Sequence, residues 1–338
     1  MKITVLTGGV GGAKFLLGVK AYLGWNPTGP SPVDASRPRG AMGADEVTAI
    51  VNTGDDIRLH GLQICPDLDS CLYTLSGVAD TERGWGRKDE TWTAAAELAS
   101  YGAEAPWFSL GDKDIATHLV RTRMLAAGYP LSAVTAALCA KWQPGVTLLP
   151  MSDQRVETHV VVADPDDSSG RPDDVALHFQ EWWTRYRTAI PAKSFRFVGA
   201  DEADPAAGVL EALAGADLIL LAPSNPVVSI GTILAVPGLR DAIGKASAPV
   251  IGVSPLIAGK PLRGHADACL AAIDVECTAQ GVGRHYGARS GGGLLDGFLV
   301  AEGESVEIPG VAVRSAPLLM TDPAATAAMV AACVELAG

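Results

Sequence analysis

The sequence predicts an α/β fold: a Rossmann-like, mostly parallel sheet with helices on both faces, plus a helical and antiparallel insertion. Short apolar runs, such as residues 3–6 and 217–222, alternate with helical patterns, as expected for parallel strands that helices cover on both faces. Three of these runs are followed by glycine or polar clusters, which contain Gly8, Asp55 and Ser224. Open parallel sheets bind ligands at this carboxyl edge.

The length of 338 residues suits one large domain or two ordinary ones. We expect residues 1–338 to form a single Rossmann-like domain, in which approximately residues 70–190 make a helical and hairpin subdomain. Residues 24–46 are rich in proline, glycine, alanine and polar side chains, so we expect a mobile surface insertion. A lid over a ligand site is the alternative role for this segment.

The formal net charge of −12 argues against a nucleic-acid-binding surface. An acidic protein that binds an anion needs a locally positive pocket, and the candidate cations are Lys14, Lys113, Arg240, Lys260 and Arg263. The six cysteines form no C-x-x-C pair, so neither a structural zinc site nor disulfides are expected. No signal-peptide core and no apolar run of about 20 residues is present, which predicts a soluble, cytoplasmic protein without membrane contact.

The first strand, at residues 3–6, leads into a glycine-rich turn and then a helix. The turn reads Gly8-Gly9-Val10-Gly11-Gly12-Ala13-Lys14. Glycines let a backbone turn sharply and approach a ligand closely, and the following helix N-terminus favours an anion. Lys14 occupies the position of the third glycine in the dinucleotide fingerprint, and Ala13-Lys14-Phe15 does not fit a P-loop. We predict a phosphate-binding turn of neither common type; a tight turn without a ligand is the alternative.

Carboxylates gather after the second strand, at residues 47–52. Asp55 and Asp56 follow that strand, and Asp67 and Asp69 flank the start of the next helix, which places four carboxylates within 15 positions. Hard oxygen ligands of this kind are those that Mg²⁺ selects. The alternatives are a solvated acidic turn and simple helix capping by Asp69.

Helices are expected at residues 85–101, 115–127 and 131–140. We expect Trp85 and Trp92 to pack in the first of these. Asp114 is a candidate cap of the second helix, and His118 is four residues further on the same face, as a structural partner of that acid. Asp112 and Lys113 lie in the preceding turn, where we expect them to meet a ligand.

The next segments are expected to form an antiparallel pair, at residues 156–163 and 176–179, and a helix whose Trp182 and Trp183 pack against the core. The α/β alternation then resumes with strands at 194–199, 217–222 and 250–253. Ser224 and Asn225 follow one of these strands and could contact a nucleotide base or ribose, or simply cap a turn. Residues 298–319 look like a hairpin, and a helix closes the chain.

Six motifs, in order along the chain, resemble the 2-phospho-L-lactate transferase family of coenzyme F-420 biosynthesis, called phosphoenolpyruvate transferase in actinobacteria. They are the glycine turn, Val51-Asn52-Thr53-Gly54-Asp55-Asp56, Pro66-Asp67-Leu68-Asp69-Ser70, Gly111-Asp112-Lys113-Asp114 with Ala116-Thr117-His118, Leu149-Pro150-Met151-Ser152-Asp153 and Ala222-Pro223-Ser224-Asn225-Pro226. The departures are Cys65 in place of a common serine, Ser70 in place of threonine, and a long insertion at residues 24–46.

The resemblance implies that the alcohol of the deazaflavin Fo attacks the phosphorus that bears a lactyl or enolpyruvyl group in a guanosine diphosphate ester, releasing GMP with the help of Mg²⁺. The implied diphosphate-binding residues are Gly9, Gly11, Gly12 and Lys14, and those for the nucleoside are Ser224 and Asn225. Asp55, with Asp67 or Asp69, would hold Mg²⁺, while Asp69, Ser70 and Asp112 would face Fo. Asp55, Asp69 and Asp112 are the catalytic candidates, and any of them could accept the hydroxyl proton. A homodimer is also implied.

Two other classes of protein compete with this interpretation. A nucleotide-sugar-binding regulator of the gluconeogenesis-factor type shares the glycine turn, but its Asp-Asp motif continues into a glycine-serine run, whereas Asp55-Asp56 continues into Ile57-Arg58-Leu59. A nicotinamide dehydrogenase is disfavoured by the broken fingerprint. The sequence assigns no residue to the choice between lactyl and enolpyruvyl donors, although its actinobacterial character favours enolpyruvyl.

Overall fold

The computed structural model describes residues 1–31, 45–103, 107–167, 173–262 and 264–338. Its centre is a seven-stranded sheet in the order β14-β13-β10-β9-β1-β2-β5, and every neighbouring pair is parallel. The strands are β1 (Lys2–Thr7), β2 (Glu46–Val51), β5 (Thr147–Pro150), β9 (Leu218–Leu221), β10 (Val250–Val253), β13 (Gly297–Ala301) and β14 (Ala312–Ala316). The predicted α/β class is confirmed.

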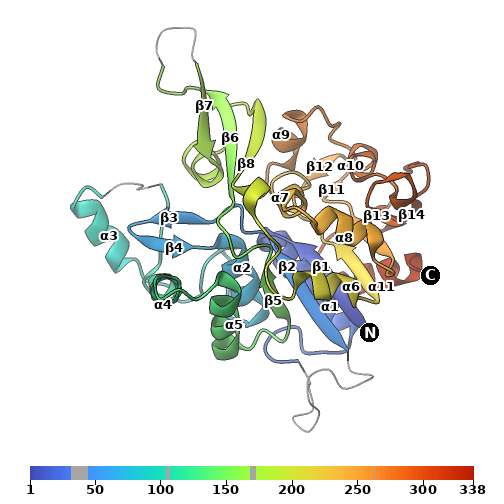
Figure 1. Cartoon of the computed structure of the whole chain (residues 1–338), viewed down its shortest axis with the longest axis horizontal. Helices are drawn as coiled ribbons and strands as arrows, with labels where there is room; N and C mark the ends of the chain where they lie inside the picture. Colours follow the sequence, from blue (N-terminus) through green and yellow to red (C-terminus); the bar gives the residue numbers. More distant parts are fainter. Residues whose placement is uncertain (32–44, 104–106, 168–172, 263) are drawn as a thin grey trace.

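Helices cover both faces of the sheet, which is why its central strands β9, β10 and β13 are continuously apolar (Figure 1). On one face, α1 (Gly9–Tyr22), α2 (Pro66–Leu75), α5 (Leu131–Trp142) and α11 (Pro323–Leu336) share a core with Val5 and Leu220. On the other, the core around Leu6 and Leu221 includes α6 (Val209–Ala214), α7 (Ile230–Ala235), α8 (Leu239–Lys245), α9 (Ala266–Ala271) and α10 (Ala279–Tyr286).

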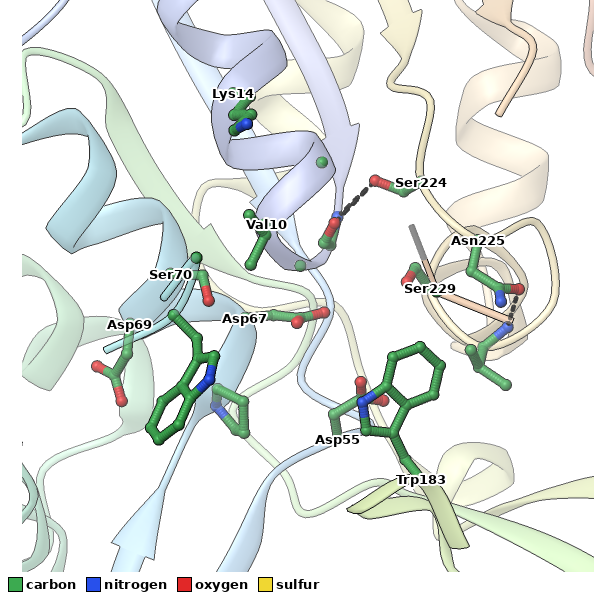
Figure 2. Close-up of a pocket in the computed structure, with 18 of the residues that line it drawn as sticks. Val10, Lys14, Asp55, Asp67, Asp69, Ser70, Trp183, Ser224, Asn225 and Ser229 are labelled. Atoms are coloured by element: carbon green, nitrogen blue, oxygen red, sulfur yellow. Dashed lines mark hydrogen bonds between the residues drawn. The ribbon is translucent and has the colours of Figure 1, made fainter. Parts of the chain in front are cut away.

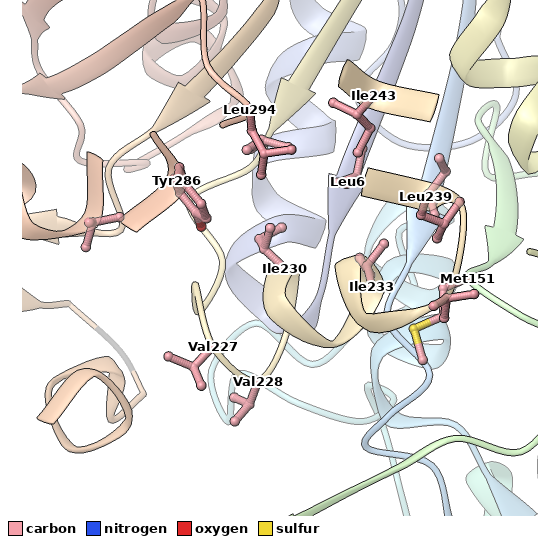
Figure 3. Close-up of a cluster of buried hydrophobic side chains, with 14 of the residues drawn as sticks. Leu6, Met151, Val227, Val228, Ile230, Ile233, Leu239, Ile243, Tyr286 and Leu294 are labelled. Atoms are coloured by element: carbon pink, nitrogen blue, oxygen red, sulfur yellow. The ribbon is translucent and has the colours of Figure 1, made fainter. Parts of the chain in front are cut away.

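The second core packs closely behind the loop that follows β9. Figure 3 shows Val227, Val228, Ile230 and Ile233 of this loop and α7 gathered with Leu6 of β1. All five side chains are at most 4% exposed. Burial of this kind fixes the loop against the sheet, so the polar residues before it have a defined position.

Between α2 and β5 the chain forms a peripheral lobe with α3 (Thr93–Ser100) and α4 (Asp112–Ala126). A short antiparallel hairpin, β3 (Ile57–Leu59) and β4 (Leu62–Ile64), which the sequence reasoning missed, packs with it and extends to the left in Figure 1. The helix expected at residues 85–101 begins only at Thr93, because Gly86 and Asp89 adopt positive φ angles of 70° and 53°, outside the right-handed helical region.

A second small sheet, in the order β7-β6-β8, projects from the top of the molecule in Figure 1. The predicted antiparallel pair is present as β6 (Glu157–Ala163) and β7 (Asp174–His178). The strand expected at 194–199 is β8 (Ser194–Val198), but it pairs antiparallel with β6 and does not join the parallel sheet. Between β7 and β8 lies a short π-helical turn, Glu181–Arg185.

The hairpin expected near the C-terminus is wrong. β13 and β14 pair in parallel, with Gly297 opposite Ala312. Two two-residue strands, β11 (Leu256–Ile257) and β12 (Lys260–Pro261), form a separate antiparallel ladder after β10. Most of the insertion expected at 24–46 lies outside the described residues, as does Arg263. Within the ranges given above, no helix is both long and apolar enough to span a bilayer.

The strand order reverses at β1, which defines the position of the site. From β1 the chain first adds β2 and β5 on one side, and later adds β9, β10, β13 and β14 on the other. At such a reversal the loops that leave neighbouring strands diverge and open a crevice at the carboxyl edge. Here those loops are the glycine turn after β1 and the segment that begins at Pro223 after β9.

Candidate active site

A cavity of about 890 Å³ lies over this crevice. Gly11, Asp55 and Ser224, from three separate strand ends, all line it. Figure 2 shows the glycine turn above the cavity, with Asp69 and Ser70 on one side, Asn225 and Ser229 on the other, and Asp67 between them. The volume is near the upper end of small-molecule sites, so it suits more than one small ligand.

The residues that pack against the glycine turn leave little room for side chains at some of its positions. Gly9 has a φ angle of +65°, and a Cβ on Gly8 would come within 2.6 Å of the Asp67 carboxylate. Gly12 differs from the others because it is absent from the wall of the cavity as the described residues form it. A Cβ there would lie 1.7 Å from Oγ1 of Thr7, so Gly12 allows helix α1 to pack on β1.

Ser224 joins the two loops at the crevice. Its hydroxyl accepts a hydrogen bond from the Gly8 N–H at 3.1 Å and donates one to the Gly8 carbonyl at 2.9 Å. Asn225 accepts hydrogen bonds at Oδ1 from the N–H groups of Val227 and Val228, at 2.9 and 3.2 Å. Both side chains therefore hold the loops in place, and both also line the cavity. Their contact with a nucleoside stays a prediction.

Asp55 and Asp67 form a pair of buried carboxylates in the wall of the cavity. Burial raises the pKa of Asp55 well above its usual range, and the negative charge of Asp67 raises it further. Burial also raises the pKa of Asp67 to about 6. Asn52 orients Asp67 by donating from Nδ2 to Oδ2 at 2.9 Å. Oδ1 of Asp55 is buried and has no hydrogen-bond partner among the residues that the structure describes.

The pair fits a divalent cation. Two carboxylates that repel each other, one with an unpartnered oxygen, would both be stabilised by a dication between them. Across the described stretches, no three acidic, histidine or cysteine side chains converge into a complete metal site. Mg²⁺ usually takes one or two carboxylates and completes its shell with water and substrate phosphates, so Asp55 and Asp67 could hold it in that manner.

Asp69 has a different environment because a cation already neutralises it. Arg121, fully buried on α4, forms an ion pair with Oδ1 of Asp69. His118 Nδ1 lies 3.7 Å from Oδ2 of Asp69 and 3.0 Å from the guanidinium of Arg121. Burial lowers the pKa of His118 to about 4, so its ring is neutral near pH 7. Oδ2 of Asp69 is buried and accepts no hydrogen bond from the described part of the chain.

On helix α4 the structure changes the roles expected for Asp112 and Asp114. His118 is the predicted partner of Asp114, with Nε2 of His118 3.9 Å from Oδ1 of Asp114, but both side chains also line the cavity. The α4 N-cap is Gly111, and Asp114 accepts a hydrogen bond from the Tyr73 hydroxyl at 2.6 Å. Asp112 does not reach the described wall: its carboxylate accepts hydrogen bonds from the N–H groups of Thr93 and Ala94 at the start of α3. Its catalytic role and its contact with Fo stay predictions.

The cations that line the cavity differ in part from those expected around a bound anion. Lys14 lines the cavity, one turn into α1 (Figure 2). Lys113, Arg240 and Lys260 do not contribute to the wall that the described residues form. Arg83, which the sequence did not single out, lines the cavity, and its guanidinium lies over the rings of both Trp85 and Trp92, at 5.0 and 4.9 Å from their centroids.

Several aromatic side chains of the wall were missed or assigned to the core. Trp182 is buried as expected, but the adjacent Trp183 lines the cavity and contacts the His265 ring edge-on at 5.1 Å between centroids. Trp85 was expected to pack in a helix and instead lines the cavity with Trp107 and Phe108. Its place between Gly84 and Gly86 was the sequence signal against a helix; Trp183 had no comparable signal.

Comparison with known proteins identifies the family of the chain. The family model described as 2-phospho-L-lactate transferase CofD matches residues 3–317. A phosphoenolpyruvate transferase of Mycobacterium avium (strain 104) is 61% identical over 338 residues, covering 100% of this chain and 99% of that protein. Its counterpart in Mycolicibacterium smegmatis is 60% identical, with the same coverage.

Among solved structures, protein BH3568 from Bacillus halodurans, a member of the UPF0052 family, matches with a TM-score of 0.58 over 99% of both chains. At 18% identity this likeness shows the fold alone. The family model and the mycobacterial relatives span nearly the whole sequence, including the glycine turn, the acidic pair and the loop after β9. The chain therefore belongs to the 2-phospho-L-lactate transferase CofD family.

Proposed function

We propose that this transferase moves a phosphoenolpyruvyl or 2-phospholactyl group from a guanosine diphosphate ester to the alcohol of the deazaflavin Fo, and that it releases GMP. The observation that carries the proposal is the shared cavity of about 890 Å³, where a glycine turn, a buried carboxylate pair and the loop after β9 meet. The name phosphoenolpyruvate transferase, given to the mycobacterial relatives, supports the enolpyruvyl donor.

The chemistry would be a phosphoryl-group transfer in which the protein positions and neutralises charge. The hydroxyl oxygen of Fo forms a new bond to the phosphorus that bears the acid. The bond from that phosphorus to the GMP oxygen breaks, its electron pair stays on GMP, and the hydroxyl proton passes to a carboxylate of the cavity. Gly9, Gly11 and Lys14 would hold the diphosphate at the start of α1, where free N–H groups and the helix dipole favour an anion. Gly12 would act indirectly, by letting α1 approach β1.

Mg²⁺ would supply positive charge to the diphosphate oxygens in a cavity rich in carboxylates. Asp55 and Asp67 are the residues that would hold it, because no cationic side chain of the described residues is paired with either of them. Ser224 would keep the glycine turn in register with the loop after β9. The nucleoside would extend from the turn toward Asn225, on the side opposite Asp69 and Ser70 (Figure 2).

The direct test is to incubate the purified protein with Fo, Mg²⁺ and each of the two guanosine diphosphate esters. GMP release and the mass of the new phosphodiester would be measured together. We expect both to appear, more rapidly with the enolpyruvyl donor. Tight binding of the donor without GMP release would instead support the non-catalytic, nucleotide-binding alternative and reject the proposed reaction.

Replacing the metal-binding acid tests the role of the carboxylate pair. The Asp55→Asn variant should lose turnover by orders of magnitude, because the dication would lose a charged ligand. Its fold should remain intact, since the change also removes a buried charge that is costly to desolvate. Calorimetric titration of Mg²⁺ in the presence of GDP, alongside circular dichroism, checks both points. Near-normal turnover of the variant would reject this metal assignment.

A further inference from the structure

The small sheet β7-β6-β8 is attached to the loop after β2, which carries Asp55. The Thr158 N–H of β6 donates a hydrogen bond to the Gly54 carbonyl at 2.7 Å. Nε2 of His178, the last residue of β7, lies 3.1 Å from the Asp56 carbonyl oxygen. The two carbonyl groups flank Asp55 in the sequence, so the small sheet holds this loop on both sides of its cavity-lining carboxylate.

The contacts of His178 determine which of its ring nitrogens carries the proton. A carbonyl oxygen can only accept, so Nε2 must donate its hydrogen to Asp56. Nδ1 accepts from the Gln180 N–H at 3.1 Å, so it must carry no hydrogen. Burial is the largest influence on the pKa of His178 and lowers it, which keeps the ring neutral near pH 7. The neutral form with hydrogen on Nε2 is the one tautomer that satisfies both neighbours.

The second of these hydrogen bonds fixes the start of a segment of the cavity wall. Gln180 is the N-cap of the π-helical turn Glu181–Arg185, and it lines the cavity together with Phe179 and Trp183. The Phe179 ring packs on the Trp183 ring at 5.5 Å between centroids. A displacement of Gln180 would therefore move the Trp183 ring as well.

Trp183 lies across the cavity from the glycine turn. In the view of Figure 2, Trp183 and Lys14 lie at opposite ends of the drawn residues, with Asp55 and Asp67 between them. A ligand that is held at the turn and reaches Asp55 therefore extends toward Trp183. The distance between Asp55 and Trp183 depends on how the small sheet is attached to the loop after β2.

We propose that His178 is a positioning residue: by bridging Asp56 and Gln180 it couples the loop after β2 to the opposite wall of the cavity and sets the distance between Asp55 and Trp183. Imidazole suits this task because one rigid ring carries both a donor and an acceptor. His178 is itself absent from the wall that the described residues form, so it acts through its neighbours. The inference rests on the proposed transfer reaction only for its kinetic test.

Hydrogen exchange tests the coupling without turnover. Addition of GDP and Mg²⁺ to the wild type should slow exchange at residues 8–14 and 179–184, because both segments contribute to the wall. His178→Phe keeps an aromatic ring and removes both hydrogen bonds. It should retain the protection of residues 8–14 and lose most of that of residues 179–184. Equal protection of residues 179–184 in the two proteins would overturn the proposal, as would the absence of such protection in the wild type.

His159→Phe is the matched control for this substitution. His159 lies opposite His178 in the register of β6 and β7, and its ring contacts the His178 ring edge-on at 5.7 Å between centroids. Among the described residues, its Nε2 reaches Glu157 on its own strand and not the loop after β2. The control should show wild-type protection of residues 179–184. A loss as large as that of His178→Phe would indicate general loosening of the small sheet and reject the role of His178.

Two further variants each keep one of the hydrogen bonds and guard against misfolding. The amide oxygen of His178→Asn can replace Nδ1 and accept from Gln180, whereas the amide nitrogen of His178→Gln can replace Nε2 and donate to Asp56. Each should lower kcat, by up to about 10²-fold for a misplacement of about 1 Å. KM for the guanosine donor should stay near the wild-type value, because the turn still holds the diphosphate. Wild-type kcat in either variant would overturn the proposal.

Nitrogen NMR of protein labelled at its six histidines reads the position of the proton directly. The signals of His178, identified by their loss in His178→Phe, should show hydrogen on Nε2 and none on Nδ1 at pH 7. A charged ring or the opposite tautomer would contradict the bridge. If the wild-type protein released no GMP, the proposed reaction would fail, whereas the exchange and NMR results would still decide whether His178 couples the two walls.

Discussion

Gly11 and Gly12 are neighbours in the first turn of α1, yet an added methyl group would meet different surroundings. At Gly11 the nearest atom would be the Pro223 carbonyl oxygen at 3.5 Å, an ordinary contact, whereas at Gly12 it would be Oγ1 of Thr7 at 1.7 Å. Gly11 lines the cavity, and Gly12 faces the sheet. Gly11 is therefore placed to contact a ligand, whereas Gly12 allows α1 to pack on the sheet.

We expect Gly12→Ala to lower the free energy of unfolding by about 1–3 kcal/mol, the usual cost of overpacking. Gly11→Ala should leave stability unchanged or slightly higher, because alanine is the better helix former, and should weaken GDP binding. Chemical denaturation and calorimetry, applied to both variants, check this pair. A Gly12→Ala protein as stable as the wild type would contradict the packing role.

Asp114 gives a residue-scale prediction for pH. Burial, together with the negative charges of Asp69 and Glu90, raises the pKa of Asp114 from 3.8 to about 6. The folded chain therefore keeps this proton at pH values where the unfolded chain has lost it, so the contribution of Asp114 to the free energy of unfolding falls as pH rises from about 4 to 6. The other groups that face Asp114 are Tyr73, His118 and Arg121.

Asp114→Asn keeps an acceptor for the Tyr73 hydroxyl and removes the ionisation. We expect the stability of this variant, relative to the wild type, to rise between about pH 4 and pH 6 and to stay constant above that window. Urea denaturation of both proteins at several pH values measures the difference. A difference that does not change with pH would show that Asp114 titrates normally in the folded protein.

At the scale of elements, the N-termini of α3 and α4 are each capped by a carboxylate from outside the helix. The N-cap of α4 is Gly111, which has no side chain. The Glu90 carboxylate takes its place by accepting from the N–H groups of Lys113 and Asp114, at 2.7 and 3.2 Å. Asp112 caps α3 in the same way, by accepting from the N–H groups of Thr93 and Ala94. The loop before α3, which carries Trp85 to the cavity, is thereby tied to α4.

Glu90→Ala should destabilise the protein by about 1 kcal/mol, the usual cost of losing a helix cap, and should speed amide exchange at the start of α4. Glu97→Ala is a matched control, because Glu97 is exposed on α3 and this substitution also removes one glutamate charge. Denaturation and hydrogen exchange measure both variants. Equal effects of the two changes would mean that Glu90 is no more than a surface charge.

At the scale of the whole molecule, the cavity is assembled by parts that are distant in sequence. The glycine turn, the start of α2 and the π-helical turn of the small sheet supply Gly11, Asp67 and Trp183 to one wall. The homodimer that the resemblance implies stays a prediction, which sedimentation analysis of the purified protein would check. Because distant segments share this wall, we expect one bound ligand to contact several of them at once.

GDP with Mg²⁺ should slow amide exchange in three separate segments, residues 8–14, 66–70 and 179–184, because all three contribute to the wall. α3 serves as the internal reference, since none of its residues takes part. Hydrogen exchange followed by mass spectrometry resolves these segments. Protection confined to residues 8–14 would show that the nucleotide binds the turn without engaging the rest of the cavity.

The sequence by itself determined the parallel sheet, the glycine turn and the meeting of Gly11, Asp55 and Ser224. These follow from local patterns, because apolar runs predict buried strands and parallel strands place their carboxyl ends on one edge. Only the tertiary structure decided the pairing of Arg121 with Asp69, which are 52 positions apart, the position of Trp183 in the wall, and the exchange of roles between Asp112 and Asp114. Such contacts depend on how helices and small sheets pack against one another, and no periodicity within a single segment encodes that packing.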